Sequence, residues 1–178
     1  PAQIIWLNLV TDGFMTLPLA LEPKEEGLLS ERLTKVPKYI LSPSAVKRTV
    51  FMGTAIGLGT FFVFIQFLDA GIEKALTISM TTSAIFQWFN AWNCKNENKS
   101  IFSVNPLDNM SLVGATILVA VLQVLAVYHP LLQRFLHTVP LDAREWGYAL
   151  AVSASVIVLE EVRKLFARRS VSRKHAYS

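Results

Sequence analysis

The sequence is poor in cysteine and in charge. Cys94 is its single cysteine, and only 17% of its 178 residues are Asp, Glu, Lys or Arg, whereas 52% are hydrophobic. One cysteine excludes an internal disulfide framework and any metal site built from several thiolates, so we expect Cys94 to be a small, buried apolar residue. With a mean hydropathy of +0.41, this composition argues against a soluble globular domain and favours a membrane protein.

The few charges are also not gathered into a basic face. The chain has 17 Lys and Arg against 13 Asp and Glu, a balance that alone is compatible with a nucleic-acid partner. The bases, however, lie in short segments between apolar runs, which is the distribution of a membrane protein with alternating sides. The sequence therefore predicts a lipid bilayer as partner and no nucleic acid.

Long apolar runs dominate what is present. A helix needs roughly 20 apolar residues to cross the hydrocarbon core, and five runs approach that length. We therefore predict an all-α, polytopic membrane protein with one transmembrane domain over residues 1–178. Its expected spans are residues 1–21, 49–68, 76–94, 110–128 and 146–166. In the second span, Gly53 and Gly57 form a pair that lets another helix approach closely.

Basic residues predict the orientation of these spans. One side holds fourteen of the 17 Lys and Arg residues and the other holds three. The first side comprises the connections 22–48 and 95–109 and the tail from residue 163, and the second comprises 69–75 and 129–145. By the positive-inside rule the first side is cytoplasmic, which puts the C-terminus inside and the N-terminus outside. Because no secretory signal is visible, we expect further helices upstream in a longer chain.

The first span contains the polar stretch NLVTDG at residues 8–13. On a regular helix Asn8, Thr11 and Asp12 share one face. A carboxylate near the bilayer centre costs about 3 kcal/mol and usually faces an ion or a polar partner; the alternative is that Asp12 ends the span or pairs with a base. The three side chains offer oxygen, the ligand of hard cations such as calcium. Gly13 and Pro18 weaken the helix after Asp12, and carbonyls freed there would add further ligands.

The third span carries a second polar stripe at helical spacing. Its members are Ser79, Ser83, Gln87 and Asn90. Hydrogen bonding between helices explains Ser79 and Ser83. For Gln87 and Asn90, the pattern leaves ion contact and interhelical bonding equally open.

Three segments resemble one family. AQIIWLNLVTDGFMTLPLALEP is similar to the sixth transmembrane helix of the calcium-transporting P-type ATPases, the type IIA cation pumps. NAWNCKNENKS resembles the end of their eighth helix, and VIVLEEVRKLFARR resembles their tenth helix and its basic end. The resemblance covers essentially the whole chain. It implies that the five spans correspond to helices six to ten, the C-terminal membrane region of an ATP-driven pump for calcium export or sequestration.

The resemblance also implies a set of ion ligands. Asn8, Thr11 and Asp12 match positions that bind transported Ca²⁺ in the family, and Gly13 matches its unwound stretch. Gln87 stands where two-site pumps have a glutamate. Replacing a carboxylate by an amide removes a full charge that would compensate a second divalent ion in a low-dielectric site. We therefore expect Asn8, Thr11, Asp12 and Gln87 to bind one calcium ion per cycle.

The resemblance assigns the remaining machinery to other parts of the longer chain, here called the parent enzyme. The family's phosphorylation motif DKTGT and its TGES motif do not occur in the sequence. Mg²⁺ and ATP are therefore expected in the parent enzyme only, and the chain alone should hydrolyse no ATP. Its expected partners are the remaining helices, of which the fifth would pack on Gly53 and Gly57, and the cytoplasmic domains, one of which would dock on the loop 22–48.

Two alternatives stay open. The same architecture suits a pump for manganese, sodium or protons, because oxygen ligands do not decide between calcium and manganese. A protein of another class, a non-catalytic five-helix interaction module, would use the polar residues to hold helices together. For Glu160 and Glu161 we expect a structural role near the cytoplasmic interface, beside Arg163 and Lys164.

Overall fold

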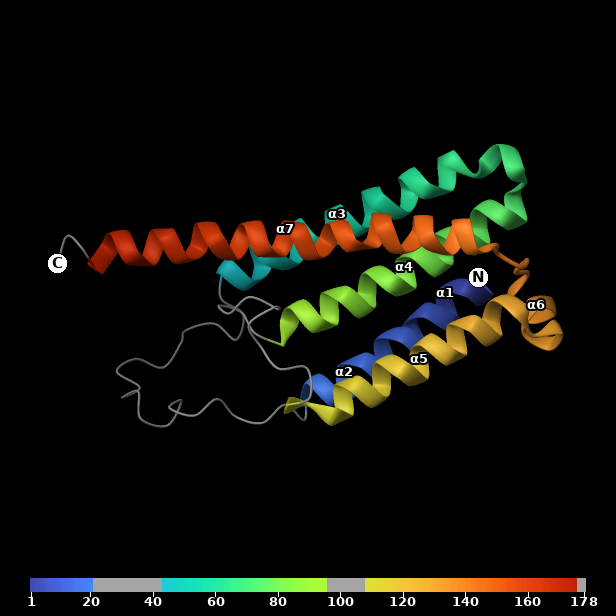
Figure 1. Ribbon diagram of the computed structural model, residues 1–178, viewed down its shortest axis with the longest axis horizontal. Helices are drawn as coiled ribbons and strands as arrows, with labels where there is room; N and C mark the ends of the chain where they lie inside the picture. Colours follow the sequence, from blue (N-terminus) through green and yellow to red (C-terminus); the bar gives the residue numbers. More distant parts are fainter. Residues whose placement is uncertain (21–42, 96–107, 176–178) are drawn as a thin grey trace.

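The computed structural model describes residues 1–20, 43–95 and 108–175, and throughout these ranges the regular elements are helices (Figure 1). The prediction of an all-α fold is confirmed. In chain order the elements are α1 (Ala2–Trp6), the π-helix η1 (Leu7–Asp12), α2 (Gly13–Ala20), α3 (Pro43–Gln66), the 3₁₀-helix η2 (Leu68–Ala70), α4 (Ile72–Cys94), α5 (Met110–Tyr128), α6 (Pro130–Leu136) and α7 (Ala143–His175). Most of the loop 22–48 lies outside the described residues.

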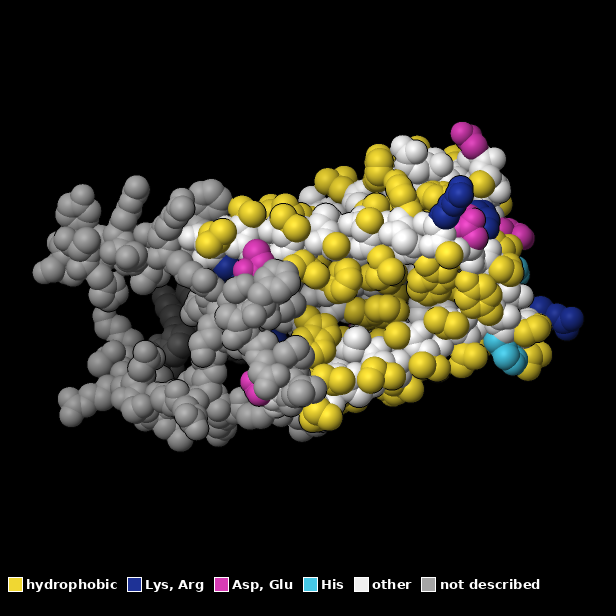
Figure 2. Space-filling model, viewed as in Figure 1, with side chains coloured by type: hydrophobic (Ala, Val, Ile, Leu, Met, Phe, Trp, Pro, Cys, Tyr) yellow, Lys and Arg dark blue, Asp and Glu magenta, His cyan; other side chains and the backbone are white. Residues whose placement is uncertain are grey.

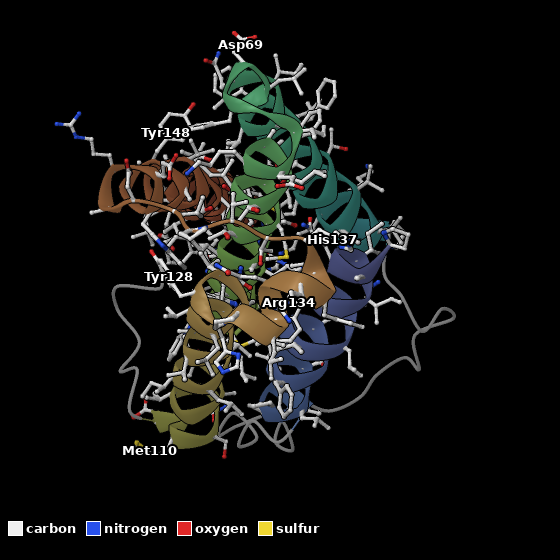
Figure 3. All side chains as sticks on the ribbon, turned by 90° about the vertical axis from the view of Figure 1, so that its right-hand side faces the viewer. Asp69, Met110, Tyr128, Arg134, His137 and Tyr148 are labelled. Carbon is white, nitrogen blue, oxygen red and sulfur yellow. The ribbon has the colours of Figure 1, made fainter. Side chains whose placement is uncertain are left out.

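The long helices run side by side and alternate in direction (Figure 1). One end of the molecule holds the N-terminus, the turn between α3 and α4, and α6. The other end holds the end of α2, the start of α3 and the C-terminal end of α7. Figure 3 views the molecule from the first end, where it labels Asp69, Arg134 and His137. This alternation is the one that the distribution of basic residues requires; which end is cytoplasmic stays a prediction.

Apolar side chains run along the described part of the face in view, and charged side chains gather at the end that holds η2 and α6 (Figure 2). Among the described helices, residues 45–66 of α3 and residues 110–128 of α5 are long and apolar enough to cross a membrane. Helix α3 begins before the predicted span 49–68, and α7 extends beyond the predicted span 146–166. The limits of the five spans within the membrane stay a prediction.

Helix α4 occupies the centre of the bundle. It packs against α3 and α7 on one side and against α2, η1 and α5 on the other. Its position explains a composition that is too polar for a lipid-facing helix, because Thr77, Thr81 and Thr82 are fully buried. Two of these hydroxyls bond within the helix: Thr77 donates to the carbonyl of Glu73 and Thr82 to that of Ile78, each at 2.7 Å.

The contact between α3 and α4 depends on a glycine that the sequence pattern did not single out. A Cβ added to Gly59 would lie 2.6 Å from Cζ of Phe86, a buried ring, whereas Cβ atoms added to Gly53 or Gly57 would meet nothing within 4 Å. Gly59 therefore allows the close approach of α3 to α4. Gly53 and Gly57 lie on a face of α3 that the described residues leave open.

The prediction that Cys94 is buried is wrong. Cys94 is exposed at the end of α4. Its Sγ lies 3.6 Å from Nη2 of Arg48 on α3. The apolar character of cysteine does not predict burial here, because Cys94 stands in the last turn of α4, where polar side chains of neighbouring helices meet.

Candidate functional site

The helix that carries the predicted ion ligands is interrupted by a π-helical turn. Segment η1, Leu7–Asp12, contains Asn8, Thr11 and Asp12 and joins α1 to α2 without a break in the chain direction. A π turn accommodates one more residue than an α turn, and such insertions are frequent at functional sites. The irregular stretch lies before Gly13. After Asp12 the chain stays helical in α2, where Pro18 lacks the N–H of a helical hydrogen bond, so a weakened helix there stays a prediction.

The π turn separates the three side chains. Asn8 and Asp12 are exposed in the described structure, whereas Thr11 is 1% exposed. A π turn is wider than an α turn, so residue i+4 stays near the face of residue i while residue i+3 rotates away. The expectation of one shared face therefore holds for Asn8 and Asp12 and is wrong for Thr11, which lies on the packed side.

A hydroxyl one turn later bonds the backbone at the end of η1. Thr16 Oγ1 donates to the carbonyl oxygen of Asp12 at 2.7 Å and contacts that of Gly13 at 3.2 Å. The Asp12 carbonyl is therefore already engaged. The polar groups that this turn exposes are mainly the carboxylate of Asp12 and the amide of Asn8.

The fourth predicted ligand lies on the neighbouring helix. Gln87 is half-buried on α4, and its Oε1 is buried without a hydrogen-bond partner in the part of the chain that the structure describes. Helix α4 packs against η1, and Ser79 Oγ on the same polar stripe is likewise buried and without a partner there. Within residues 1–20, 43–95 and 108–175, no three His, Cys, Asp or Glu residues cluster in a way that could hold a metal. Calcium takes roughly six to eight oxygen ligands, so these residues supply part of a coordination shell.

Two amide side chains outside the predicted ligand set bond the interrupted helix near its ends. Gln123 of α5 accepts a hydrogen bond at 3.2 Å from Trp6, the residue before η1. Asn109, the N-cap of α5, donates at 3.3 Å to the carbonyl of Pro18 in α2. The signal for Gln123 is visible in retrospect, since it is the one amide in the apolar run 110–128.

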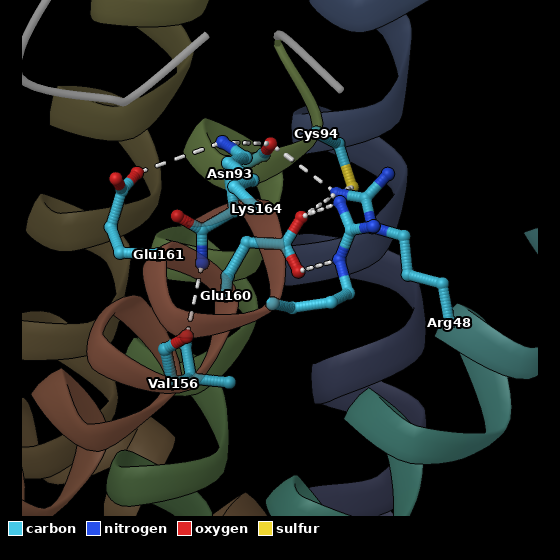
Figure 4. A network of polar contacts seen from close by, with 8 residues as sticks. Arg48, Asn93, Cys94, Val156, Glu160, Glu161 and Lys164 are labelled. Carbon is cyan, nitrogen blue, oxygen red and sulfur yellow. Dashed lines mark hydrogen bonds and ion pairs between the residues drawn. The ribbon is translucent and has the colours of Figure 1, made fainter. Parts of the chain in front are cut away.

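A second polar cluster joins α3, α4 and α7 (Figure 4). Its centre is Glu160, which is fully buried and pairs with Arg48 at 2.9 Å and with Arg163 at 2.8 Å. Arg48 also donates to the carbonyl of Asn93 at 3.3 Å, and the Asn93 amide donates to the carbonyl of Val156 at 3.3 Å. The cluster bridges three helices, which supports the expected structural role of the acidic pair. The participation of Arg48 and Asn93 was not foreseen.

Comparison with known proteins establishes the family. The sequence model described as "Cation transporting ATPase, C-terminus" matches residues 1–166. The chain belongs to this family. The family match, together with the two candidate spans, makes it an integral membrane protein.

Several calcium-transporting ATPases are similar to this cation-transporting ATPase segment. A calcium-transporting ATPase of Bacillus subtilis is 32% identical over 86% of the chain and 18% of its own length. One of Plasmodium falciparum is 27% identical over 96% of the chain and 18% of its own length. The human calcium-transporting ATPase type 2C member 2 is 28% identical over 92% of the chain and 18% of its own length. The chain thus spans about a fifth of the length of these relatives.

Proposed function

We propose that the chain is the C-terminal membrane portion of an ATP-driven calcium pump that moves one ion per cycle. The observation that carries the proposal is the π-helical turn, which presents the carboxylate of Asp12 and the amide of Asn8 from within an apolar helix. Membership of the cation-transporting ATPase family and relatives named as calcium-transporting ATPases support calcium as the cargo.

The proposed ligands are Asn8, Thr11, Asp12 and Gln87. Asp12 supplies the charge, and Asn8 and Gln87 supply neutral oxygen. Thr11 lies on the packed side of η1, so its hydroxyl would enter the shell from the protein interior. All four are oxygen donors, which hard cations prefer. Asp12 is the one carboxylate in this set. Its single negative charge compensates part of the charge of one divalent ion and leaves none for a second.

The rest of the shell would come from other helices of the parent enzyme. The exposed face of η1 and the open face of α3 around Gly53 and Gly57 are the surfaces on which those helices would pack. A groove of 330 Å³ between α3 and α4, lined in part by Met52, Gly53 and Asn90, adjoins the second face. Mg²⁺ and ATP would act in the cytoplasmic domains of the parent enzyme, and the C-terminus of this chain would lie on the same, cytoplasmic side of the bilayer.

Ion-dependent phosphoenzyme formation in the full-length parent enzyme tests the cargo. We expect micromolar calcium to support phosphorylation from ATP, and we expect one calcium ion to enter sealed vesicles per ATP hydrolysed. Phosphorylation that responds to manganese, sodium or pH but not to calcium would assign the architecture to another cation. An absence of any ion-dependent phosphoenzyme would favour the non-catalytic module, and a ratio of two would contradict the single-ion proposal.

A further inference from the structure

One buried side chain connects three helices beside the π turn. Gln123 of α5 is 1% exposed. Its Oε1 accepts from Nε1 of Trp6 at 3.2 Å, and its Nε2 donates to Oγ1 of Thr81 on α4 at 3.1 Å. Thr81 is itself fully buried. Both ends of the amide are therefore engaged, one by the residue that precedes η1 and the other by the central helix.

Burying the amide of Gln123 costs free energy, which indicates that its two hydrogen bonds have a specific role. An amide buried in an apolar environment is unfavourable unless hydrogen bonds compensate its lost hydration. Gln123 stands in a run of Leu, Val and Ala, where an apolar residue would pack without any such requirement. Its two bonds fix the indole of Trp6, and with it the N-terminal end of η1, relative to α4 and α5.

The other end of the interrupted helix is fixed independently. The Asn109 amide donates to the carbonyl of Pro18, and Asn109 Oδ1 accepts from the amide of Leu112 at 2.9 Å, so this side chain is held by the start of α5. Between the two fixed points the chain contains one residue more than a regular α-helix would place there. Releasing the Trp6 end would let η1 rewind to an α-helix, which would turn Thr11 away from the packed side and change the angle between the Asn8 and Asp12 side chains.

We propose that Gln123 is a positioning residue for the ion site: through Trp6 it holds the π turn in which Asn8 and Asp12 lie on the exposed face while Thr11 lies on the packed side. The inference rests on the proposed function of that turn. Gln123 contacts no transported ion in this account. Gln123 holds the ligands in place before the ion arrives. Loss of Gln123 should therefore weaken ion binding and leave the later steps of the transport cycle unaffected.

The test is the calcium dependence of phosphoenzyme formation in the full-length parent enzyme carrying Gln123→Leu. We expect the half-saturating calcium concentration to rise about tenfold, which corresponds to about 1.4 kcal/mol, with the maximal phosphoenzyme level and maximal turnover unchanged. The matched control is Gln133→Leu. Gln133 also loses a hydrogen bond, which it donates to the carbonyl of Val127 at 2.7 Å, but that bond joins α6 to α5 and does not involve Trp6 or η1. Calcium dependence should be unchanged in that control.

A second variant guards against misfolding. Trp6→Phe keeps an aromatic ring and removes only the indole donor, so it should raise the half-saturating concentration in the same direction. In the double variant with Gln123→Leu the two effects should not add, because both break the same contact. An unchanged calcium dependence in both single variants, or a loss confined to maximal turnover, would overturn the inference. If Asp12→Asn also left calcium dependence unchanged, the proposed function itself would fail; if Asp12→Asn abolished it, only the role of Gln123 would fail.

Discussion

At the scale of single residues, Asp12 and Gln123 differ in how their polar groups are accommodated within apolar helices. The amide of Gln123 is buried and bonded at both ends. The carboxylate of Asp12 is exposed and forms no ion pair with the side chains that the structure describes. A satisfied buried amide is suited to holding helices, whereas a carboxylate left open in a membrane helix is suited to a mobile partner.

A bulkier residue at Gly59 should destabilise the fold. The variant Gly59→Val places carbon atoms against the buried ring of Phe86, and overpacking of this kind costs about 1–3 kcal/mol. We expect a lower Tm for the purified protein in detergent. Gly114→Val in α5 is the control, because a Cβ there meets nothing within 4 Å. Equal Tm losses in the two variants would show that the contact between α3 and α4 does not depend on Gly59.

At the scale of elements, the sequence predicted where helices occur better than how one of them is wound. The apolar runs and the charges between them indicate helix positions because charge is costly in the hydrocarbon core. Whether residues 7–12 form an α or a π turn is not set by their own periodicity. The contacts at the two ends of this helix come from Gln123, Leu136 and Asn109, far away in the sequence. Local periodicity contains no information about them, so the burial of Thr11 was not foreseen.

The same limit applies to the end of α4. Cys94 was expected in the core on its chemical character, but helix packing puts it at an exposed end beside Arg48. Glu160 and Arg163 are three residues apart, so their pairing is readable from the sequence. The contribution of Arg48 comes from another helix and is visible only in the folded structure.

Loss of the charge at Glu160 should loosen α7 from α3. The variant Glu160→Gln leaves Arg48 and Arg163 near a neutral group in a buried setting, and breaking a buried pair by removing one partner costs about 3 kcal/mol. We expect a clear drop in Tm for the purified protein. Glu73→Gln is the control, since Glu73 is exposed in the first turn of α4 and its loss should cost less than about 1 kcal/mol. A larger loss for Glu73→Gln would contradict this assignment.

At the scale of the whole molecule, the alternating helices put two sets of connections at opposite ends. The end with η2 and α6 carries Lys74 paired with Glu145 at 3.0 Å, and Trp146 donates to the hydroxyl of Tyr128 at 3.0 Å. Aromatic residues with a polar tip are typical of membrane interfaces. These contacts suit a membrane interface, and which side of the membrane this end faces stays a prediction.

Labelling with a membrane-impermeant maleimide tests that orientation in the parent enzyme in intact cells or sealed right-side-out vesicles. In a parent enzyme from which every native cysteine has been removed, the exposed positions Asp69→Cys and His137→Cys should react from outside. Cys94 restored alone, exposed at the opposite end, should react only after permeabilisation. Labelling of Cys94 in sealed membranes, with protection of the other two positions, would reverse the topology.

The central claim is that Asp12 binds the transported cation, and the most direct test is calcium uptake by the full-length parent enzyme with Asp12→Asn. Neutralising the carboxylate removes the charge of the proposed ligand set, so the half-saturating calcium concentration should rise at least about a hundredfold, corresponding to about 3 kcal/mol. Asp69→Asn, at the exposed turn before α4, should leave uptake unchanged. Uptake by Asp12→Asn with wild-type rate and calcium dependence would contradict the account.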